Sequence, residues 1–152
     1  MRRIWRASLA CLTTMKFAAD DARPADEKLA EGLQRWVAAC VMHFRASALA
    51  FRVTASLRPE FRAELRRLAN DFYADLAGLM EQGRREGRLD FEDAAVTAKA
   101  MGGAVGFMYT WYRPDGRLPP EQLAERLTET LYRMIGLRPI PRKRTPTTRK
   151  RT

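Results

Sequence analysis

Apolar side chains recur every three or four residues along most of the chain, as they do on one face of an α-helix. The first stripe predicts an amphipathic helix over residues 25 to 46. It consists of Leu29, Leu33, Trp36, Val37, Cys40, Val41 and Phe44. No stretch alternates apolar and polar positions as a half-buried strand does, so the pattern predicts an all-α fold, a helical bundle of about five helices.

Proline and glycine residues divide the middle of the chain. Residues 47 to 57 are expected to form a short helix or a bend. A long helix is expected to start at Pro59, a residue that suits the first turn, and to end at Gly83 and Gly87. Its apolar stripe consists of Phe61, Leu65, Leu68, Phe72, Leu76, Leu79 and Met80.

Two more helices are predicted in the last part of the chain. The first is expected to start at Asp90, which favours an N-cap position, and to reach Tyr112. A turn at residues 113 to 117 separates it from a last helix over residues 119 to 136, which Gly136 is expected to close. The stripe of the last helix consists of Leu123, Leu127, Leu131, Met134 and Ile135.

The charge is unevenly distributed along the chain. With 152 residues, 46% of them hydrophobic, the chain fits one globular domain, and its formal net charge is +10. Residues 1 to 24 are expected to form an irregular basic segment, and residues 138 to 152, with seven Lys or Arg and no acid, a disordered basic tail. Residues 17 to 137 carry a net charge of −1, which argues against a basic DNA-binding face on the helical domain, residues 25 to 137.

Candidate catalytic and metal-binding residues are few. His43 is the only histidine and has no acidic neighbour in sequence, and there is no phosphate-binding glycine loop or nucleophile motif. The two cysteines, Cys11 and Cys40, are too few for a Cys/His metal site and give no disulfide framework, so each is most simply a small apolar packing residue in a reducing compartment. The sequence therefore predicts no enzymatic activity, no metal and no cofactor, and a cytoplasmic location.

Two segments have features of membrane-directed sequences. Residues 1 to 12 combine a basic start with a short apolar stretch, like a signal peptide, but two threonines and Lys16 end the stretch early, so export is the less favoured interpretation. Residues 94 to 112 carry only Lys99 as a formal charge, but a lysine at mid-span opposes insertion into a bilayer. A buried helix of a soluble bundle, with no membrane span, accounts better for residues 94 to 112.

The helix predicted over residues 90 to 112 carries small residues on one face. Gly102 and Gly106 form a G-x-x-x-G pair, extended by Ala98, which allows another helix to approach closely. Packing within the domain explains such a pair at least as well as a contact between subunits. Because this helix is apolar nearly all round, it must be covered on more than one side, and a partner subunit is one candidate.

Three segments together resemble a known family. They are residues 57 to 68 (LRPEFRAELRRL), residues 81 to 89 (EQGRREGRL) and residues 111 to 118 (WYRPDGRL). They resemble the C-terminal regulatory domain of TetR-family transcriptional repressors, in the subgroup that includes the steroid-catabolism and acyl-CoA-responsive regulators. The resemblance covers residues 25 to 137, and the last segment is its most specific part.

The resemblance implies a domain that dimerises and binds an effector. The helices over residues 91 to 112 and 119 to 136 would pair with those of a second copy as a four-helix bundle. The candidate interface residues on them are Ala98, Met101, Gly102, Val105, Gly106, Leu123, Leu127 and Leu131. A pocket among the preceding helices would bind a small apolar effector, an acyl-CoA or a steroid-like acid. The candidate lining residues of this pocket are Trp36, Cys40, Phe44, Phe72, Leu76, Met80, Phe107 and Trp111. Without the resemblance, their spacing alone would favour a role in filling the core.

The chain departs from the family at two places. Residues 1 to 24 are too few for the family's N-terminal helix-turn-helix module, so the chain is expected not to read DNA sequence alone. Two explanations fit the absence of that module. The chain could be a truncated or mis-started gene product, or a sensor that forms a heterodimer with full-length relatives. Pro119 stands where relatives often have a serine, so the last helix lacks a side-chain N-cap.

Two functions are consistent with these features. The first is a homodimeric, TetR-type effector-binding domain. The alternative is a helical protein that binds nucleic acid or acidic surfaces nonspecifically through its basic ends, because clustered cations attract any polyanion. The residues expected to contact phosphates in that case are Arg142, Lys143, Arg144, Arg149, Lys150 and Arg151.

Overall fold

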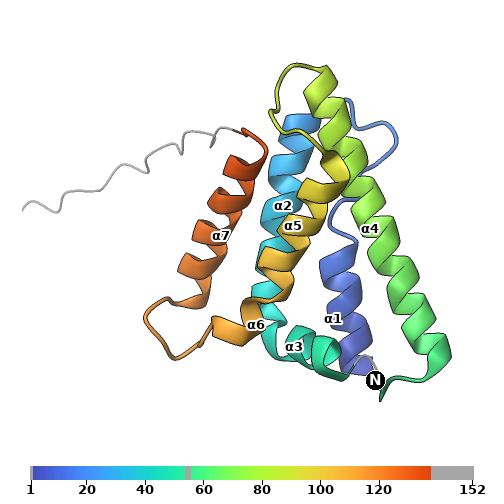
Figure 1. The fold of residues 1–152 in the computed structure, drawn as a ribbon, viewed down its shortest axis with the longest axis vertical. Helices are drawn as coiled ribbons and strands as arrows, with labels where there is room; N and C mark the ends of the chain where they lie inside the picture. The colour runs from blue at the N-terminus through green and yellow to red at the C-terminus, as the bar shows by residue number, and fades with distance from the viewer. Residues whose placement is uncertain (1, 54–55, 138–152) are drawn as a thin grey trace, which may run out of the picture.

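The computed structural model describes residues 2–53 and 56–137, and these residues form seven α-helices and no β-strand (Figure 1). The helices, in chain order, are α1 (Arg2–Leu12), α2 (Ala25–Met42), α3 (Phe44–Val53), α4 (Pro59–Arg85), α5 (Ala94–Gly106), α6 (Met108–Trp111) and α7 (Pro120–Met134). The predicted all-α fold is confirmed, with seven helices in the described residues where about five were expected.

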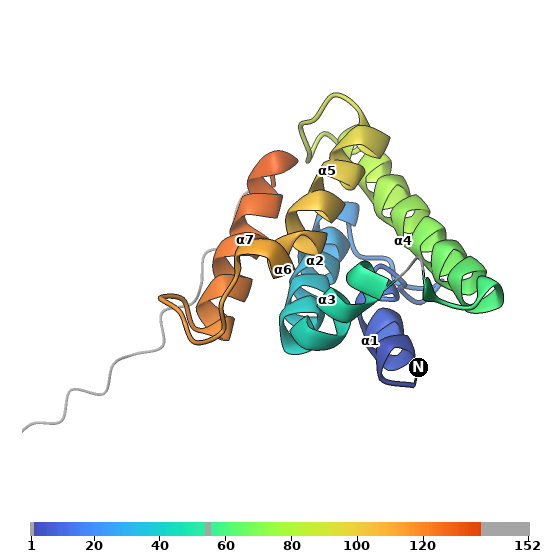
Figure 2. The same ribbon diagram turned by 60° about the horizontal axis from the view of Figure 1, so that its bottom comes forward.

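Helix α2 lies at the centre of the bundle. It packs against α1, α4 and α7, and α5 packs against α4. In both views α4 and α7 lie on opposite sides of the molecule, with α2 and α5 between them (Figures 1 and 2). The two short helices α3 and α6 contact each other at one end of the bundle.

The core lies where the predicted stripes of α2 and α4 meet. Leu29, Leu33 and Val37 of α2 are fully buried, and so are three residues of α4 that follow one another at intervals of four. Those three are Phe72, Leu76 and Met80. Residues four apart lie on the same helix face, so each stripe presents a continuous apolar surface to its neighbour.

Helix α1 corrects the expectation that residues 1 to 24 are irregular. Ile4, Ala7 and Cys11 are buried, and their spacing places them on one helix face. Arg2 and Arg3 are exposed on the other side. This stripe extends only from Ile4 to Cys11, which is too short to predict a helix from spacing alone.

The helix predicted over residues 90 to 112 also differs in the structure. It is broken at Phe107 into α5 and α6, and the N–H of Thr110 donates a hydrogen bond to the Phe107 carbonyl, which tightens the turn. Three glycines in the last five residues of α5 weaken this part of the helix, because glycine opposes helix formation by about 1 kcal/mol relative to alanine. The N-cap is Asp93, not Asp90, whose N–H instead donates to the Ile135 carbonyl over 2.9 Å.

Replacing Asp93 with alanine is expected to lower the free energy of unfolding by about 1 kcal/mol. Its Oδ1 accepts a hydrogen bond from the N–H of Val96 over 2.8 Å, and α2, α4 and α7 have no such side-chain cap. Urea unfolding followed by circular dichroism measures the loss. Asp93→Ser should keep most of the stability, since a serine oxygen caps equally well. An equal loss in both variants would contradict the capping role.

Helices α4 and α7 are each followed by a glycine that lets the chain change direction. Gly87, after α4, has a φ of 71°, and Gly136, after α7, has a φ of 66°, a conformation that other residues rarely adopt. The predicted stop at Gly83 is wrong, because Gly83 lies inside α4. A Cβ there would meet the Leu89 side chain at 2.5 Å, so this glycine serves the close approach of the following loop.

Candidate functional site

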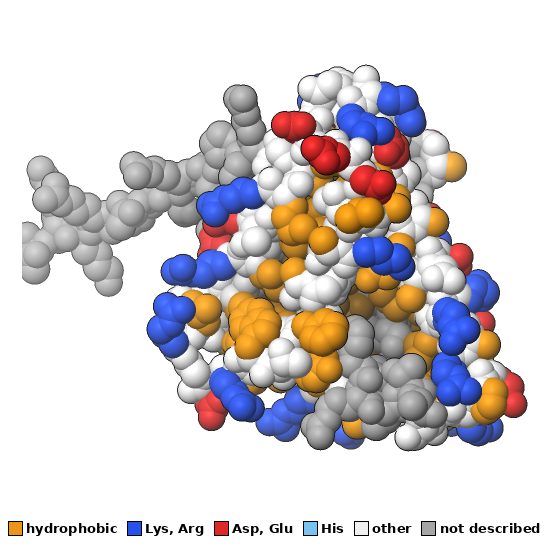
Figure 3. All heavy atoms as spheres, in the orientation of Figure 1, with side chains coloured by type: hydrophobic (Ala, Val, Ile, Leu, Met, Phe, Trp, Pro, Cys, Tyr) orange, Lys and Arg blue, Asp and Glu red, His pale blue; other side chains and the backbone are white. Residues whose placement is uncertain are grey.

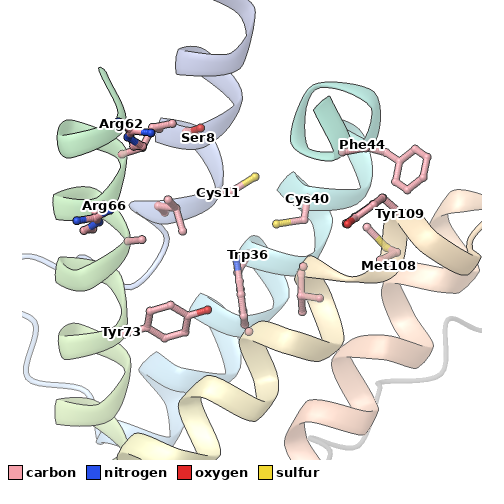
Figure 4. A pocket seen from close by; sticks show the side chains of 17 residues that line it. Ser8, Cys11, Trp36, Cys40, Phe44, Arg62, Arg66, Tyr73, Met108 and Tyr109 are labelled. Atoms are coloured by element: carbon pink, nitrogen blue, oxygen red, sulfur yellow. The ribbon is translucent and has the colours of Figure 1, made fainter. Parts of the chain in front are cut away.

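A largely apolar cavity of about 360 Å³ lies between six of the helices (Figure 4). Helices α1 and α2 contribute Ser8, Cys11, Leu12, Trp36 and Cys40, and α3 contributes Phe44 and Ala48. From α4 come Arg62, Leu65, Arg66, Ala69 and Tyr73, and from α5 and α6 come Gly102, Val105, Gly106, Met108 and Tyr109. Its volume falls within the range of small-molecule sites, and its wall of carbon and sulfur with few polar groups is typical of them.

The cavity wall carries positive charge on one side. Arg62 and Arg66, one helical turn apart on α4, both line it, and no Asp or Glu is among the described lining residues (Figure 4). The exposed Lys99 is not a lining residue, but its ammonium lies 3.7 Å from the centre of the ring of Tyr73, which is one. An anionic group on an otherwise apolar molecule would therefore be attracted to this wall.

Tyr73 supplies a polar group inside the apolar wall. Its hydroxyl points toward Trp36 across the cavity (Figure 4). Burial, and secondarily the neighbouring Cys40, raise the pKa of Tyr73, so the phenol keeps its proton at neutral pH and can donate a hydrogen bond to a ligand. Gly102 makes the room for it, because a Cβ at residue 102 would lie 1.8 Å from the Tyr73 hydroxyl oxygen.

Aromatic contacts hold the lining residues in place from behind. The Trp36 ring lies 4.7 Å from the ring of the fully buried Phe72. Phe44 packs edge to face against Tyr112 at 5.3 Å, which joins α3 to the end of α6. Such aromatic pairs add about 0.5 to 1.5 kcal/mol beyond the buried area, so they restrain the wall of the cavity.

The structure brings together only part of the predicted pocket. Trp36, Cys40 and Phe44 line the cavity. Of the other five predicted residues, Phe72, Leu76 and Met80 are fully buried in the core and Phe107 and Trp111 are exposed, so none of these lines the cavity. Phe72, Leu76 and Met80 face α2 in the closely packed core. After the helix break, Met108 and Tyr109 line the cavity, whereas Phe107 and Trp111 are exposed.

The predicted lining also missed the polar residues of α4. Arg62 and Arg66 lie outside the apolar stripe that was predicted for this helix. Residues 62, 65, 66, 69 and 73 nevertheless follow a helical spacing of their own, next to the core stripe. This second stripe, which mixes arginine, leucine, alanine and tyrosine, is the signal in the sequence that could have located the cavity.

The residues predicted to form a dimer interface are buried within the single chain, which corrects that assignment. Ala98, Met101, Gly102 and Val105 of α5 face the chain's own interior, as do Leu123, Leu127 and Leu131 of α7. Gly106 is half-buried and lines the cavity. Gly102 packs closely against Tyr73 of α4, so the G-x-x-x-G pair serves packing within the domain, the alternative that the sequence left open.

A different face of α5 and α6 is both apolar and exposed. Val96, Phe107 and Trp111 leave 65%, 59% and 54% of their surface exposed. Figure 3 shows hydrophobic side chains gathered over these helices, with Lys and Arg side chains around them. Phe107 also stacks on Tyr109 at 6.1 Å between ring centres, which fixes the outward position of its ring.

Two further findings concern the alternatives raised by the sequence. Among the described helices, none has the length and apolar character required to cross a bilayer. Within the same residues, no group of three or more His, Cys, Asp or Glu is placed to hold a metal ion. The predicted phosphate contacts, Arg142, Lys143, Arg144, Arg149, Lys150 and Arg151, lie outside the described residues.

Comparison with known proteins assigns the chain and its fold to a family. The model of the family "Tetracyclin repressor-like, C-terminal domain" matches residues 22–135, three quarters of the chain. The chain belongs to this family. It is thus a domain of a TetR-family transcriptional regulator, as its resemblance to that family implies. A search of the curated proteins gives no significant match.

Solved structures of TetR-family regulators share the fold. PfmR from Thermus thermophilus is 20% identical, with a TM-score of 0.73 over 87% of this chain and 72% of that chain. A TetR-family regulatory protein from Rhodococcus is 17% identical, with a TM-score of 0.74 over 88% and 70%. AibR in complex with isovaleryl coenzyme A and operator DNA is 22% identical, with a TM-score of 0.66 over 86% and 69%.

Proposed function

We propose that the chain is the effector-binding and dimerisation domain of a TetR-type transcriptional regulator, and that its effector is an apolar molecule with an acidic group. The observation that carries this proposal is the cavity, in which an apolar interior meets Arg62 and Arg66 on α4. The apolar part of the effector would lie beside Trp36 and Val105, and its acidic group would face the two guanidinium groups.

Acyl-CoA thioesters and steroid-like acids both have this chemistry. AibR, whose fold is similar, binds isovaleryl coenzyme A, which supports the first class. A cavity of about 360 Å³ has room for a short branched acyl chain but not for a whole coenzyme A, so the nucleotide part would extend out of the cavity past α4. The phosphates would then lie on the side where Arg62 and Arg66 provide positive charge.

A thermal-shift series tests the proposed effector class, because a ligand that binds only the folded state raises the unfolding temperature. The probes are isovaleryl-CoA, octanoyl-CoA, free coenzyme A, a bile acid and octanol. Stabilisation by the thioesters or by the bile acid at concentrations at which free coenzyme A and octanol have no effect supports the proposal. Equal stabilisation by free coenzyme A would show that the apolar interior is not used.

Replacing Arg62 and Arg66 together with glutamine is expected to weaken binding of the acidic effector by about tenfold, since two charge-assisted contacts at a partly exposed site are lost. Isothermal titration calorimetry measures the change. The matched control, Arg67→Gln with Arg84→Gln, removes two charges from the same helix outside the cavity lining, where these arginines pair with Glu64 and Glu81. An equal loss in the control would mean that only net charge matters.

The second part of the proposed function is homodimer formation through the exposed face of α5 and α6. Val96, Phe107 and Trp111 are large apolar residues left exposed along α5 and α6, and a second copy of the same surface could cover them about a two-fold axis. Aromatic residues surrounded by polar ones are typical of the energetic centre of an interface. A longer relative with the same face would form the heterodimer that the sequence also allows.

A further inference from the structure

The two cysteines of the chain meet at the wall of the cavity. Cys11 comes from α1 and Cys40 from α2, and the two helices pack against each other. Figure 4 shows both side chains at the cavity, and their thiols form a hydrogen bond with each other. Both residues are buried, with 5% and 8% of their surface exposed, so the cavity is their route of contact with small molecules.

This arrangement differs from two cysteines that merely fill a core. The chain contains two cysteines in all, 29 positions apart in sequence, and the fold places both thiols in contact on different helices. The sequence alone assigns each of them a packing role. Two thiols in contact within reach of a cavity have a chemistry that neither has alone, since one can react and the other can resolve the product.

We propose that Cys11 and Cys40 form a dithiol site at which hydroperoxides that enter the cavity are reduced, leaving a disulfide that joins α1 to α2. The oxidant is hydrogen peroxide or a small organic hydroperoxide. In total, the two thiols lose two protons and two electrons, and the peroxide is reduced to two waters, or to one water and one alcohol.

The two steps assign different roles to the cysteines. The hydrogen bond to Cys11, together with burial, raises the pKa of the Cys40 thiol well above its usual value, so Cys40 keeps its proton. Because Cys40 holds its proton, we assign the role of nucleophile to Cys11, which reacts as its thiolate. Cys11 attacks one peroxide oxygen, so that an S–O bond forms, the O–O bond breaks, and the leaving oxygen takes up the proton that Cys11 has released.

Cys40 completes the reaction. Its sulfur attacks the sulfur of the Cys11 sulfenic acid, so that the S–S bond forms and the S–O bond breaks. The departing hydroxide takes the Cys40 proton and leaves as water. Sulfenic acids react readily with a thiol in contact, so the disulfide should form before a second peroxide oxidises Cys11 further.

Disulfide formation changes the cavity. A disulfide places the two sulfurs about 2.05 Å apart, much closer than two hydrogen-bonded thiols, so α1 must shift toward α2. Helix α1 can make this shift, because it is short and buries only Ile4, Ala7 and Cys11. The shift narrows the cavity, and we expect effector binding to weaken by about tenfold, a coupling that rests on the proposed function.

The test uses the full chain in its native state. Hydrogen peroxide or cumene hydroperoxide is added to the reduced protein, and intact mass spectrometry follows the product. We expect a mass lower by two hydrogens, loss of both thiols to alkylation, and a peptide containing Cys11 linked to Cys40 after digestion without reductant. Dithiothreitol should reverse all three changes.

Variants of the single cysteines distinguish reaction at the dithiol site from general oxidation of the chain. Cys11→Ser and Cys40→Ser, with Cys11→Ala and Cys40→Ala as second versions, should not lose two hydrogens, and Cys40→Ser should accumulate oxygen on Cys11. A wild-type chain that keeps both thiols, gains oxygen atoms without the disulfide, or links only between chains would overturn the proposal. Effector binding to the reduced wild-type chain is measured separately, so failure of the proposed function is seen there and leaves the mass result unchanged.

Discussion

Replacing Phe107 and Trp111 with aspartate is expected to convert the chain from a dimer into a monomer, with the dissociation constant raised at least about 100-fold. Phe107, between α5 and α6, and Trp111, at the end of α6, leave 59% and 54% of their surface exposed in the single chain. Each contributes a large apolar area that only a partner removes from water, and each aspartate adds a charge that dimerisation would have to desolvate. Sedimentation velocity over a range of concentrations measures the change.

The control for this variant is Leu9→Asp, which introduces a charge at an exposed apolar residue of α1, away from the proposed dimer face. It should leave the dimer intact. Thermal unfolding of both variants shows whether the fold is retained, since residues so exposed stabilise the monomer little. A wild-type chain that is monomeric at high micromolar concentration, or a double variant that dimerises like the wild type, would refute the assigned interface.

The sequence predicted the helices well wherever one apolar stripe lay between clear boundary residues. The stripe of α4 starts after Pro59 and extends to Met80, and packing against α2 buries that face as expected. The chain continues as a helix beyond Gly83, because a buried glycine facing Leu89 is compatible with a helix even though its propensity is low. The ends of the helices therefore cannot be predicted without knowledge of the tertiary contacts.

The cavity could be predicted less well, because its position depends on how each helix is rotated toward its neighbours. A stripe of large apolar residues has the same spacing whether it fills a core or lines a cavity. On α4 the core receives Phe72, while the adjacent positions Arg66 and Tyr73 face the cavity. The contact between Cys11 and Cys40 likewise required α1, which the sequence did not predict as a helix.

The predicted dimer interface shows the same limit of prediction from sequence. The resemblance to the family implied that Gly102 contacts a second subunit, and close packing within the domain was the alternative. In the structure the closely packed neighbour is Tyr73 of the same chain. The apolar character around the whole of α5 also predicted a second cover, and Val96 and Phe107 are exposed positions that the proposed dimer would cover.

Phe72→Ala is expected to lower the free energy of unfolding by about 3 to 5 kcal/mol, the usual effect of truncating a buried phenylalanine. Phe72 is fully buried, and its ring lies 4.7 Å from Trp36 and 5.4 Å from Tyr73, two residues that line the cavity. Domains of this size are stable by only about 5 to 15 kcal/mol, so the loss is a large part of the total. Urea unfolding followed by circular dichroism measures it.

The same substitution should also affect the cavity, because Trp36 and Tyr73 lose the ring that supports them. Phe72→Leu, which leaves a smaller void, serves if the alanine variant does not fold, and its loss of stability should be smaller. Phe17→Ala is the matched control, since Phe17 is half-buried and contacts the guanidinium groups of Arg23 and Arg35 instead of the core. We expect effector affinity to fall with Phe72→Leu and to stay unchanged with Phe17→Ala. If Phe72→Ala costs no more stability than Phe17→Ala, then Phe72 does not hold α4 against α2, and the cavity wall has another support.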